Sequence, residues 1–362
     1  MRLVWLLVIG LVLAFRCALA QEPTDCAAIR SKLDPATGVF KSEKCVTYSE
    51  LPSSVLKEAR LRTIGALGAG GRKHLPYVLE LLKDEDWDVR TAAAEALGLI
   101  GDDETAPYLV AVISPRDWRL TFQAILSLAK LNTPQANGIL ADVANTYWLP
   151  AIAEAAHDLT KEHGAAPSLT QSSAEETLMN FCEASTDQAS LPRCANVADE
   201  RDIERYNWEV EKYRIRMGLA FLNHPALKGA TPLGATLKVD GGEFIGTDHG
   251  EWGGDLVFAH GSTRQSILKE NILAVAKRGD DILVITGLTH LDSRLGYIFG
   301  LSRQKDGTWI AQRRWRLPGA PRHMLMTPDG TIGLHGIFGS VLYRPDDTLQ
   351  WLACGQSYSC RP

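Results

Sequence analysis

Three histidines in the last third of the chain follow glycines at related spacings. Gly246-Thr-Asp-His249 and Gly287-Leu-Thr-His290 share one frame, and Gly333-Leu-His335 is one residue shorter. Imidazoles that lie near carboxylates bind zinc or another divalent ion, or take part in acid–base chemistry. The carboxylates beside these histidines are Asp248, Glu251 and Asp292. The alternative is that these polar loops simply point to solvent. We therefore expect the histidine-bearing loops to contact a ligand rather than to perform chemistry.

The segment Gly250-Glu-Trp-Gly-Gly254 is the densest mixture of glycine and aromatic residues. An exposed Trp252 on such a backbone would stack on a sugar or a peptide, whereas loop tryptophans more often cover a core. We leave open whether these loops bind a metal ion. The candidate ligand-binding residues are therefore Asp248, His249, Glu251, Trp252, His290, Asp292 and His335.

Sequence motifs for catalysis are missing. There is no Gly-x-Ser-x-Gly and no His-Glu-x-x-His. The glycine-rich stretch Gly65–Gly71 lacks the Gly-Lys-Ser/Thr ending of a phosphate loop. We therefore expect no cofactor and favour a non-enzymatic protein. A hydrolase or lyase that uses the histidine-bearing loops is the alternative.

The first twenty residues resemble a secretory signal peptide. Arg2 gives a positive start, Leu3–Phe15 is an apolar run too short for a comfortable membrane span, and Ala18-Leu-Ala20 is a cleavage site. We expect cleavage after Ala20 and a mature protein that is soluble and secreted or periplasmic.

Six cysteines follow that cleavage site, and an even number in an exported protein indicates disulfides. Fifteen pairings are open. The cysteines form three sequence-local pairs, which we predict to be bonded: Cys26–Cys45, Cys182–Cys194 and Cys354–Cys360.

The charge balance argues against nucleic acid as a partner. The formal net charge is −5, and removal of Arg2 and Arg16 would make it −7. No basic stripe interrupts the acidic balance, so phosphate-rich surfaces are poor partners.

Trp87, Trp118 and Trp148 are spaced 31 and 30 residues apart, and the sequence around them repeats. Apolar residues follow each tryptophan at helical spacing, and a second segment repeats as well: Leu75-Pro-Tyr-Val aligns with Ala106-Pro-Tyr-Leu. A period of this length is typical of a helical solenoid, which presents surface to a partner. We expect the tryptophans to wedge neighbouring repeats together.

The run Val89–Gly101, with its Ala-Leu-Gly-Leu-Ile-Gly ending, resembles the short HEAT-like repeats that also occur in phycobilin lyases. The resemblance spans about residues 52–165 and implies stacked helix pairs with a binding face. It carries no lyase activity over, because no motif for that activity is visible.

From about residue 235 the pattern changes to short strands and Gly/Asp turns, in three units of about forty residues. Each unit is predicted to be a four-stranded meander, similar to a β-propeller blade. Three blades leave strand edges to protect, either by pairing with a second copy, which would give a homodimer, by docking on the solenoid, or by another β-fold. The expected strands are Thr236–Val239, Glu243–Thr247, Asp255–Ala259, Gln265–Leu268, Ile272–Ala276, Ile282–Thr286, Gly296–Leu301, Trp309–Leu317, His323–Met326, Thr331–Leu334, Val341–Tyr343 and Leu349–Ala353.

The fold class predicted from these patterns is multidomain α and β: an α-solenoid of HEAT-like helix pairs followed by an all-β domain of three propeller-blade-like meanders. The expected divisions are a signal peptide 1–20, a disulfide-bearing segment 21–52, the solenoid 53–195, a capping helix and linker 196–230, and the β domain 231–362. The expected function is an exported scaffold whose solenoid binds a protein partner, with ligand, glycan or metal binding by the β domain as the alternative.

Overall fold

The computed structural model describes residues 61–62, 64–101, 103–161, 173–185, 218–290, 293–336 and 339–354. The chain divides into two compact units, Met1–Ala66 and Leu67–Pro362, and the elements below belong to the second. The expected signal peptide and the Cys26–Cys45 pair lie outside the described residues. Within the described residues, no helix combines the length and apolar character needed to cross a membrane.

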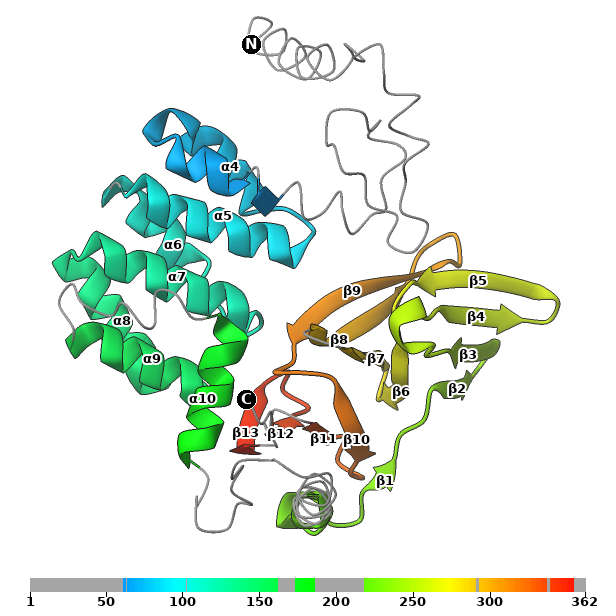
Figure 1. Ribbon diagram of the computed structural model, residues 1–362. Helices are drawn as coiled ribbons and strands as arrows, with labels where there is room; N and C mark the ends of the chain where they lie inside the picture. The colour runs from blue at the N-terminus through cyan, green and yellow to red at the C-terminus, as the bar shows by residue number, and fades with distance from the viewer. Residues whose placement is uncertain are drawn as a thin grey trace, which may run out of the picture. The chain divides into compact units, whose positions relative to one another are not determined.

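Helices occupy the first half of this unit, as the repeat pattern predicts (Figure 1). First helices that begin at or near the repeated tryptophans pack against each other and against the second helices. The elements are η3 (Arg72–His74), α4 (Leu75–Leu81), α5 (Trp87–Ile100), η4 (Asp103–Thr105), α6 (Ala106–Ala111), α7 (Trp118–Leu131), α8 (Pro134–Thr146), α9 (Pro150–Lys161) and α10 (Ala174–Ser185).

The helix ends follow from local chemistry. The side chains of Asp86 and Asp117 accept backbone N–H groups at the starts of α5 and α7, where such groups lack helical partners. Gly101 and Asn132 end the same two helices in the left-handed conformation. Between these ends, Leu97 and Leu128 are fully buried.

The second half forms three antiparallel sheets, and every predicted strand overlaps one of the observed strands. The first sheet has β2 (Thr236–Val239), β3 (Gly242–Gly246), β4 (Leu256–His260) and β5 (Thr263–Leu268). The middle sheet has β6 (Ile272–Arg278), β7 (Asp281–His290), β8 (Ser293–Arg303) and β9 (Trp309–Arg316). The last sheet has β10 (Pro321–Met326), β11 (Ile332–Gly336), β12 (Gly339–Tyr343) and β13 (Leu349–Cys354), with the unpredicted β1 (Thr231–Pro232) beside β10. None of the three sheets closes on itself within the described strands.

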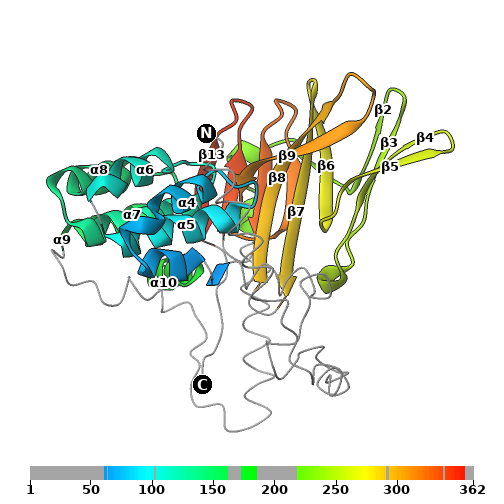
Figure 2. The ribbon, with the colours of Figure 1, turned by 90° about the horizontal axis from the view of Figure 1, so that it is seen from above.

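The middle sheet is buried on both faces, and Figure 2 shows its strands between those of the other two sheets. Val284 and Phe299 pack with Phe244 of the first sheet. The neighbouring Leu283 points the other way and packs with Leu334 of the last sheet. This alternation is what a strand between two apolar layers requires. We call β1–β13 together the β domain.

Three hairpins of the β domain share one turn. An aspartate accepts hydrogen bonds from the backbone N–H and the hydroxyl of the threonine two residues later, in the pairs Asp306–Thr308, Asp329–Thr331 and Asp346–Thr348. The residue between each pair has a positive φ: Gly307 at 87°, Gly330 at 84° and Asp347 at 63°. Glycine adopts this conformation without steric cost, whereas an aspartate there needs a compensating interaction.

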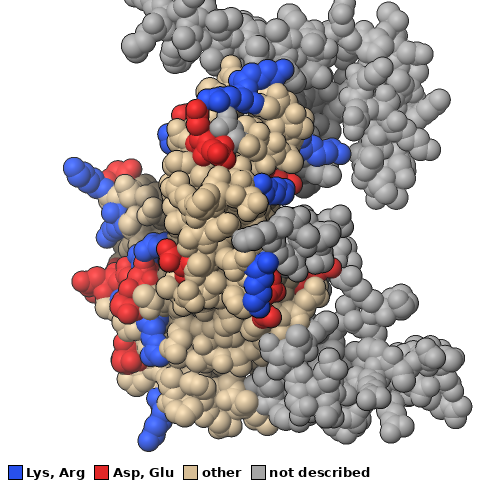
Figure 3. Space-filling view, turned by 90° about the vertical axis from the view of Figure 1, so that its left-hand side faces the viewer, with Lys and Arg blue, Asp and Glu red and all other residues tan. Residues whose placement is uncertain are grey.

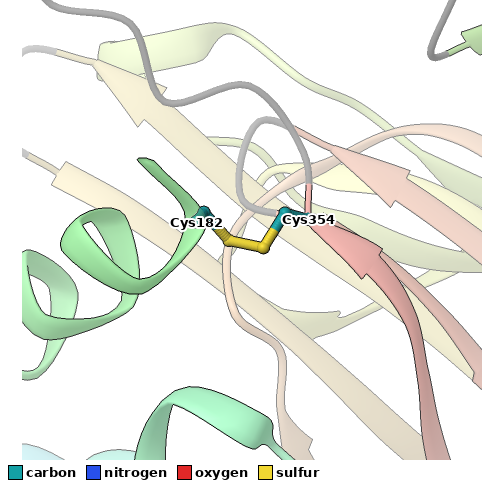
Figure 4. The surroundings of a disulfide bond; sticks show 2 residues. All are labelled: Cys182 and Cys354. Atoms are coloured by element: carbon teal, nitrogen blue, oxygen red, sulfur yellow. A yellow bond between two sulfur atoms is a disulfide. The ribbon is translucent and has the colours of Figure 1, made fainter. Parts of the chain in front are cut away.

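The disulfide in the described residues joins Cys182 of α10 to Cys354 at the end of β13 (Figure 4). The sequence-local predictions Cys182–Cys194 and Cys354–Cys360 are therefore wrong. Folding brings the two Cα atoms to 5.4 Å although 172 residues separate them in sequence, and a disulfide requires that proximity. The remaining partners, Cys194 and Cys360, lie outside the described residues.

We expect peptide mapping of the unreduced protein to recover one cross-linked species that contains both Cys182 and Cys354. A Cys182→Ser, Cys354→Ser variant should lose about 2–5 kcal/mol of unfolding free energy, because the bond closes a long loop between helices and strands. Recovery of Cys182 linked to Cys194 would contradict this pairing.

Candidate functional site

The repeated tryptophans reach the β domain. Each lies at the start of a first helix, and each contacts β8, β9 or the residue after β9. Trp87 meets Tyr297 edge-on with ring centroids 6.3 Å apart, Trp118 Nε1 donates to the Leu317 carbonyl at 3.0 Å, and Trp148 meets Trp315 edge-on at 6.2 Å. These contacts with the β domain come in addition to the predicted role as wedges between repeats. The 31-residue period also places a row of anchors for the β domain.

A buried arginine lies at the centre of this joint. Arg316 of β9 is 1% exposed. Its guanidinium contacts Asp88 Oδ1 at 3.1 Å and Asp117 Oδ1 at 3.0 Å. The two carboxylates belong to the starts of successive first helices, where the helix dipole stabilises negative charge. Burial raises the pKa of Asp117, and the Arg316 guanidinium opposes that rise.

The side chain of Asp347 makes hydrogen bonds that compensate for its unfavourable backbone conformation. Its Oδ1 accepts from Trp315 Nε1 at 3.1 Å and from the Tyr343 hydroxyl at 2.6 Å. Its Oδ2 accepts from Arg116 Nη2 of the helical repeats at 2.5 Å. Glycine, which stands at the matching turns, would relieve the strain but remove all three bonds. The aspartate therefore fastens the β domain to the segment before α7.

The predicted site residues on the loop between β3 and β4 lie together and face solvent. Asp248, His249, Glu251 and Trp252 are all exposed, and Trp252 is 84% exposed. The backbone beneath them is fixed by the buried Asn271, whose Oδ1 accepts from His249 N at 3.2 Å and whose Nδ2 donates to the Gly250 carbonyl at 2.6 Å. Trp252 is therefore not a core cover but a side chain presented on an ordered loop.

His335 lies apart from that loop. It belongs to β11 rather than to a loop, is 8% exposed, and lies on the face of the last sheet that points away from the middle sheet. Its ring stacks on Phe221 at 5.2 Å, and Nδ1 is 2.8 Å from Ser340 Oγ. Burial, with smaller contributions from His323 and Arg322, lowers the pKa of His335 to about 4. A neutral, packed imidazole is a structural element of this sheet.

The structure describes the other two predicted site residues only in part. His290 ends β7, opposite Ser293 of β8, and Asp292 falls outside the described residues. Among the residues with a described position, no three His, Cys, Asp or Glu side chains gather closely enough to hold a metal ion. The structure thus brings four predicted residues together on one loop and places His335 elsewhere.

A repeated surface feature was not singled out by sequence reasoning. Tyr77 of α4 and Tyr108 of α6 stand at matching repeat positions and are 50% and 44% exposed. The next residues, Val78 and Leu109, are fully buried, so the tyrosines mark the outer face of each second helix. The aligned Pro-Tyr pairs are visible in the sequence. Only the exposed fractions of the two tyrosines show that they lie on the surface rather than in the core. Over the helical repeats, Figure 3 shows acidic and basic side chains interspersed around a broad uncharged area.

In a comparison with known protein families, residues 50–129 match the HEAT repeats. HEAT repeats generally mediate protein–protein interaction. No curated protein and no solved structure matches the chain.

Removal of Arg316 should destabilise the joint. Arg316→Met leaves Asp117 buried without its counter-charge, so we expect a loss of about 3–5 kcal/mol in unfolding free energy, measured by urea denaturation. Arg314→Met is the matched control on the same strand, because the Arg314–Asp281 pair is partly exposed and should contribute about 1 kcal/mol or less. Equal losses in the two variants would contradict a central role for Arg316.

Acid should weaken the last sheet through His335. The folded pKa of about 4 lies below the ordinary 6.5. Between these two pH values His335 is protonated in the unfolded chain but neutral in the folded chain. The stabilisation is complete above about pH 6.5 and is lost as the pH falls toward 4, by about 3 kcal/mol in total. His335→Gln should flatten this dependence in urea titrations at about pH 7.5 and about pH 4.5. His249→Gln, at an exposed site, is the control, and an unchanged slope in His335→Gln would refute the assignment.

Proposed function

We propose that the protein is an exported, non-enzymatic interaction protein that binds a protein partner through the second helices of its HEAT-like repeats. Export rests on the signal-peptide pattern of residues 1–20. A disulfide between distant segments supports it, because such bonds persist in oxidising compartments. The mature chain is then soluble, and the β domain braces the repeats.

The choice of surface follows from what the β domain covers. Trp87, Trp118 and Arg316 are buried where β9 crosses the starts of the first helices. That edge is filled by the protein's own chain and is not open to another molecule. The second helices remain, and they carry the observation on which the proposal rests: an exposed tyrosine at the same position of two successive repeats.

The second helices that carry the two tyrosines begin close together. Arg72, just before α4, forms a salt bridge with Glu104, just before α6, at 2.5 Å. This contact joins the beginnings of the two second helices. Tyr77 and Tyr108 follow it by five and four residues. Tyrosine is enriched at protein interfaces because it buries a large ring with little conformational entropy to lose and keeps a polar hydroxyl.

The finer architecture of the β domain belongs to the same proposal. Three antiparallel meanders with face-to-face cores, two of which share the Asp–Thr turn, support a set of three propeller-like blades. Docking on the helical repeats protects β9, one of the edge strands. Association of two copies through the remaining edges is the alternative, which the mass of the purified protein in solution distinguishes.

The test compares two surfaces of the same repeats. Partners cross-linked to the protein in its native compartment are identified by mass spectrometry, and the strongest one is purified for affinity measurement. Tyr77→Ser, Tyr108→Ser should weaken binding by about tenfold or more, because interface aromatics concentrate the binding energy. Leu99→Ser is the matched control: Leu99 is a similarly exposed apolar residue, but on the first helix α5. Unchanged affinity of the tyrosine variant, with both variants folded, would refute the second-helix surface.

A further inference from the structure

We propose that the second-helix surface around Tyr77 and Tyr108 binds a proline-rich segment of its partner in the polyproline II conformation, with successive turns of that segment on the two tyrosines. This inference rests on the proposed function, because it specifies the partner chemistry of the same surface. Its support comes from the stacking of the repeats, the hydroxyl groups of the tyrosines and the low charge of the helices that carry them.

The stacking of the repeats sets the spacing of the two tyrosines. The first helices α5 and α7 approach closely, since Ser127 Oγ of α7 donates to the Ala94 carbonyl of α5 at 2.9 Å. Packed helices lie about 8–10 Å apart, so the backbones of Tyr77 and Tyr108, at matching repeat positions, are separated by about the same distance. One side of a polyproline II helix repeats every three residues, or about 9.3 Å. The two-residue repeat of an extended strand is only about 6.6 Å, so a strand does not fit the same pair of rings.

The tyrosine hydroxyls can donate to a ligand. Tyr77 and Tyr108 are half-exposed, and within the part of the chain that the structure describes no hydrogen bond engages either hydroxyl. The carbonyl groups of a polyproline II segment have no internal hydrogen bonds and accept from such donors. In an α-helix, whose two-turn repeat of about 10.8 Å would also suit the spacing, the carbonyls are already bonded internally. The hydroxyls therefore favour a polyproline II ligand over a helical one.

A rigid backbone presents each ring. Pro76 and Pro107 precede the tyrosines in the first turns of α4 and α6, and both prolines are exposed. The proline ring fixes the backbone on one side of each tyrosine, and the fully buried Val78 and Leu109 follow on the other side. A side chain on an ordered backbone loses less entropy on binding, and a polyproline II segment is itself stiff. Aromatic side chains are the surfaces on which proline-rich segments dock in other recognition domains.

The second helices α4 and α6 carry little charge. α6 has no charged residue, and the single charged residue of α4, Glu80, pairs with Lys83 at 3.7 Å. Before the two helices, Arg72 pairs with Glu104 at 2.5 Å. A strongly charged partner would gain little from such exposed pairs. A proline-rich segment needs no charge, so its binding should not depend on salt.

The probe is decaproline, acetylated and amidated at its ends and carrying a fluorescent label, titrated into the purified full-length protein and followed by anisotropy. We expect saturable binding that changes less than about twofold from about 20 mM to about 300 mM NaCl, because there is no net attraction to screen. Tyr77→Ser and Tyr108→Ser should each weaken binding about threefold, and together about tenfold or more, because each ring holds one turn. Tyr77→Phe, Tyr108→Phe, which keeps the rings and removes the hydroxyls, should have an intermediate effect.

Controls separate this ligand from the surface that binds it. Leu99→Ser removes an exposed apolar side chain of the first helix α5 and should bind decaproline as the parent protein does. A ten-residue peptide of alternating glycine and serine, uncharged but flexible, should not bind. Absence of decaproline binding, or equal binding by a folded Tyr77→Ser, Tyr108→Ser variant, overturns the proposal. If the cross-linked partner loses affinity for that variant but decaproline does not compete with the partner, the proline-rich ligand is wrong while the second-helix surface stands.

Discussion

A guanidinium removed from water needs a negative partner, because an isolated buried charge costs several kcal/mol. Arg316 has two partners, Asp88 and Asp117, both at the N-terminal ends of first helices. The unpaired N–H groups there favour negative charge, so the helices hold the carboxylates where the guanidinium needs them. Because the carboxylates come from successive repeats, one side chain of β9 fixes the repeats to each other as well as to the β domain.

The aromatic contacts extend that joint along the repeats. The repeat at Trp148 lacks the Asp-Trp pair with which the repeats at Trp87 and Trp118 begin, since Tyr147 precedes Trp148. There the Tyr147 hydroxyl donates to the Ser114 carbonyl at 2.9 Å, and Trp148 Nε1 donates to the Pro115 carbonyl at 2.8 Å. These bonds fix the segment that carries Arg116, whose carbonyl accepts from Arg316 N at 2.8 Å. The departure from the repeat thus supports the same β9 backbone.

Local patterns predicted the local structure. Helical periodicity, helix caps and Asp-Gly turns act within a few residues, and the helices and β2–β13 were found where these signals placed them. Long-range choices were not predictable in the same way. Cys182 pairs across 172 residues because α10 meets the end of β13. His335 does not lie on a loop with the other predicted site residues, because its strand directs the side chain toward Phe221. Asp347 carries a sequence signal, an aspartate where sister turns have glycine, but its partners come from three different elements.

The distribution of aromatic residues connects the joint to binding. A helical repeat has an edge and a second-helix face that can contact other chains, and burial of Trp87 and Trp118 against the β domain uses the edge within the molecule. An interaction protein built this way must offer surfaces that its own domains leave uncovered. Tyr77, Tyr108 and Trp252 lie on such surfaces, and each is exposed while its backbone is held by buried neighbours.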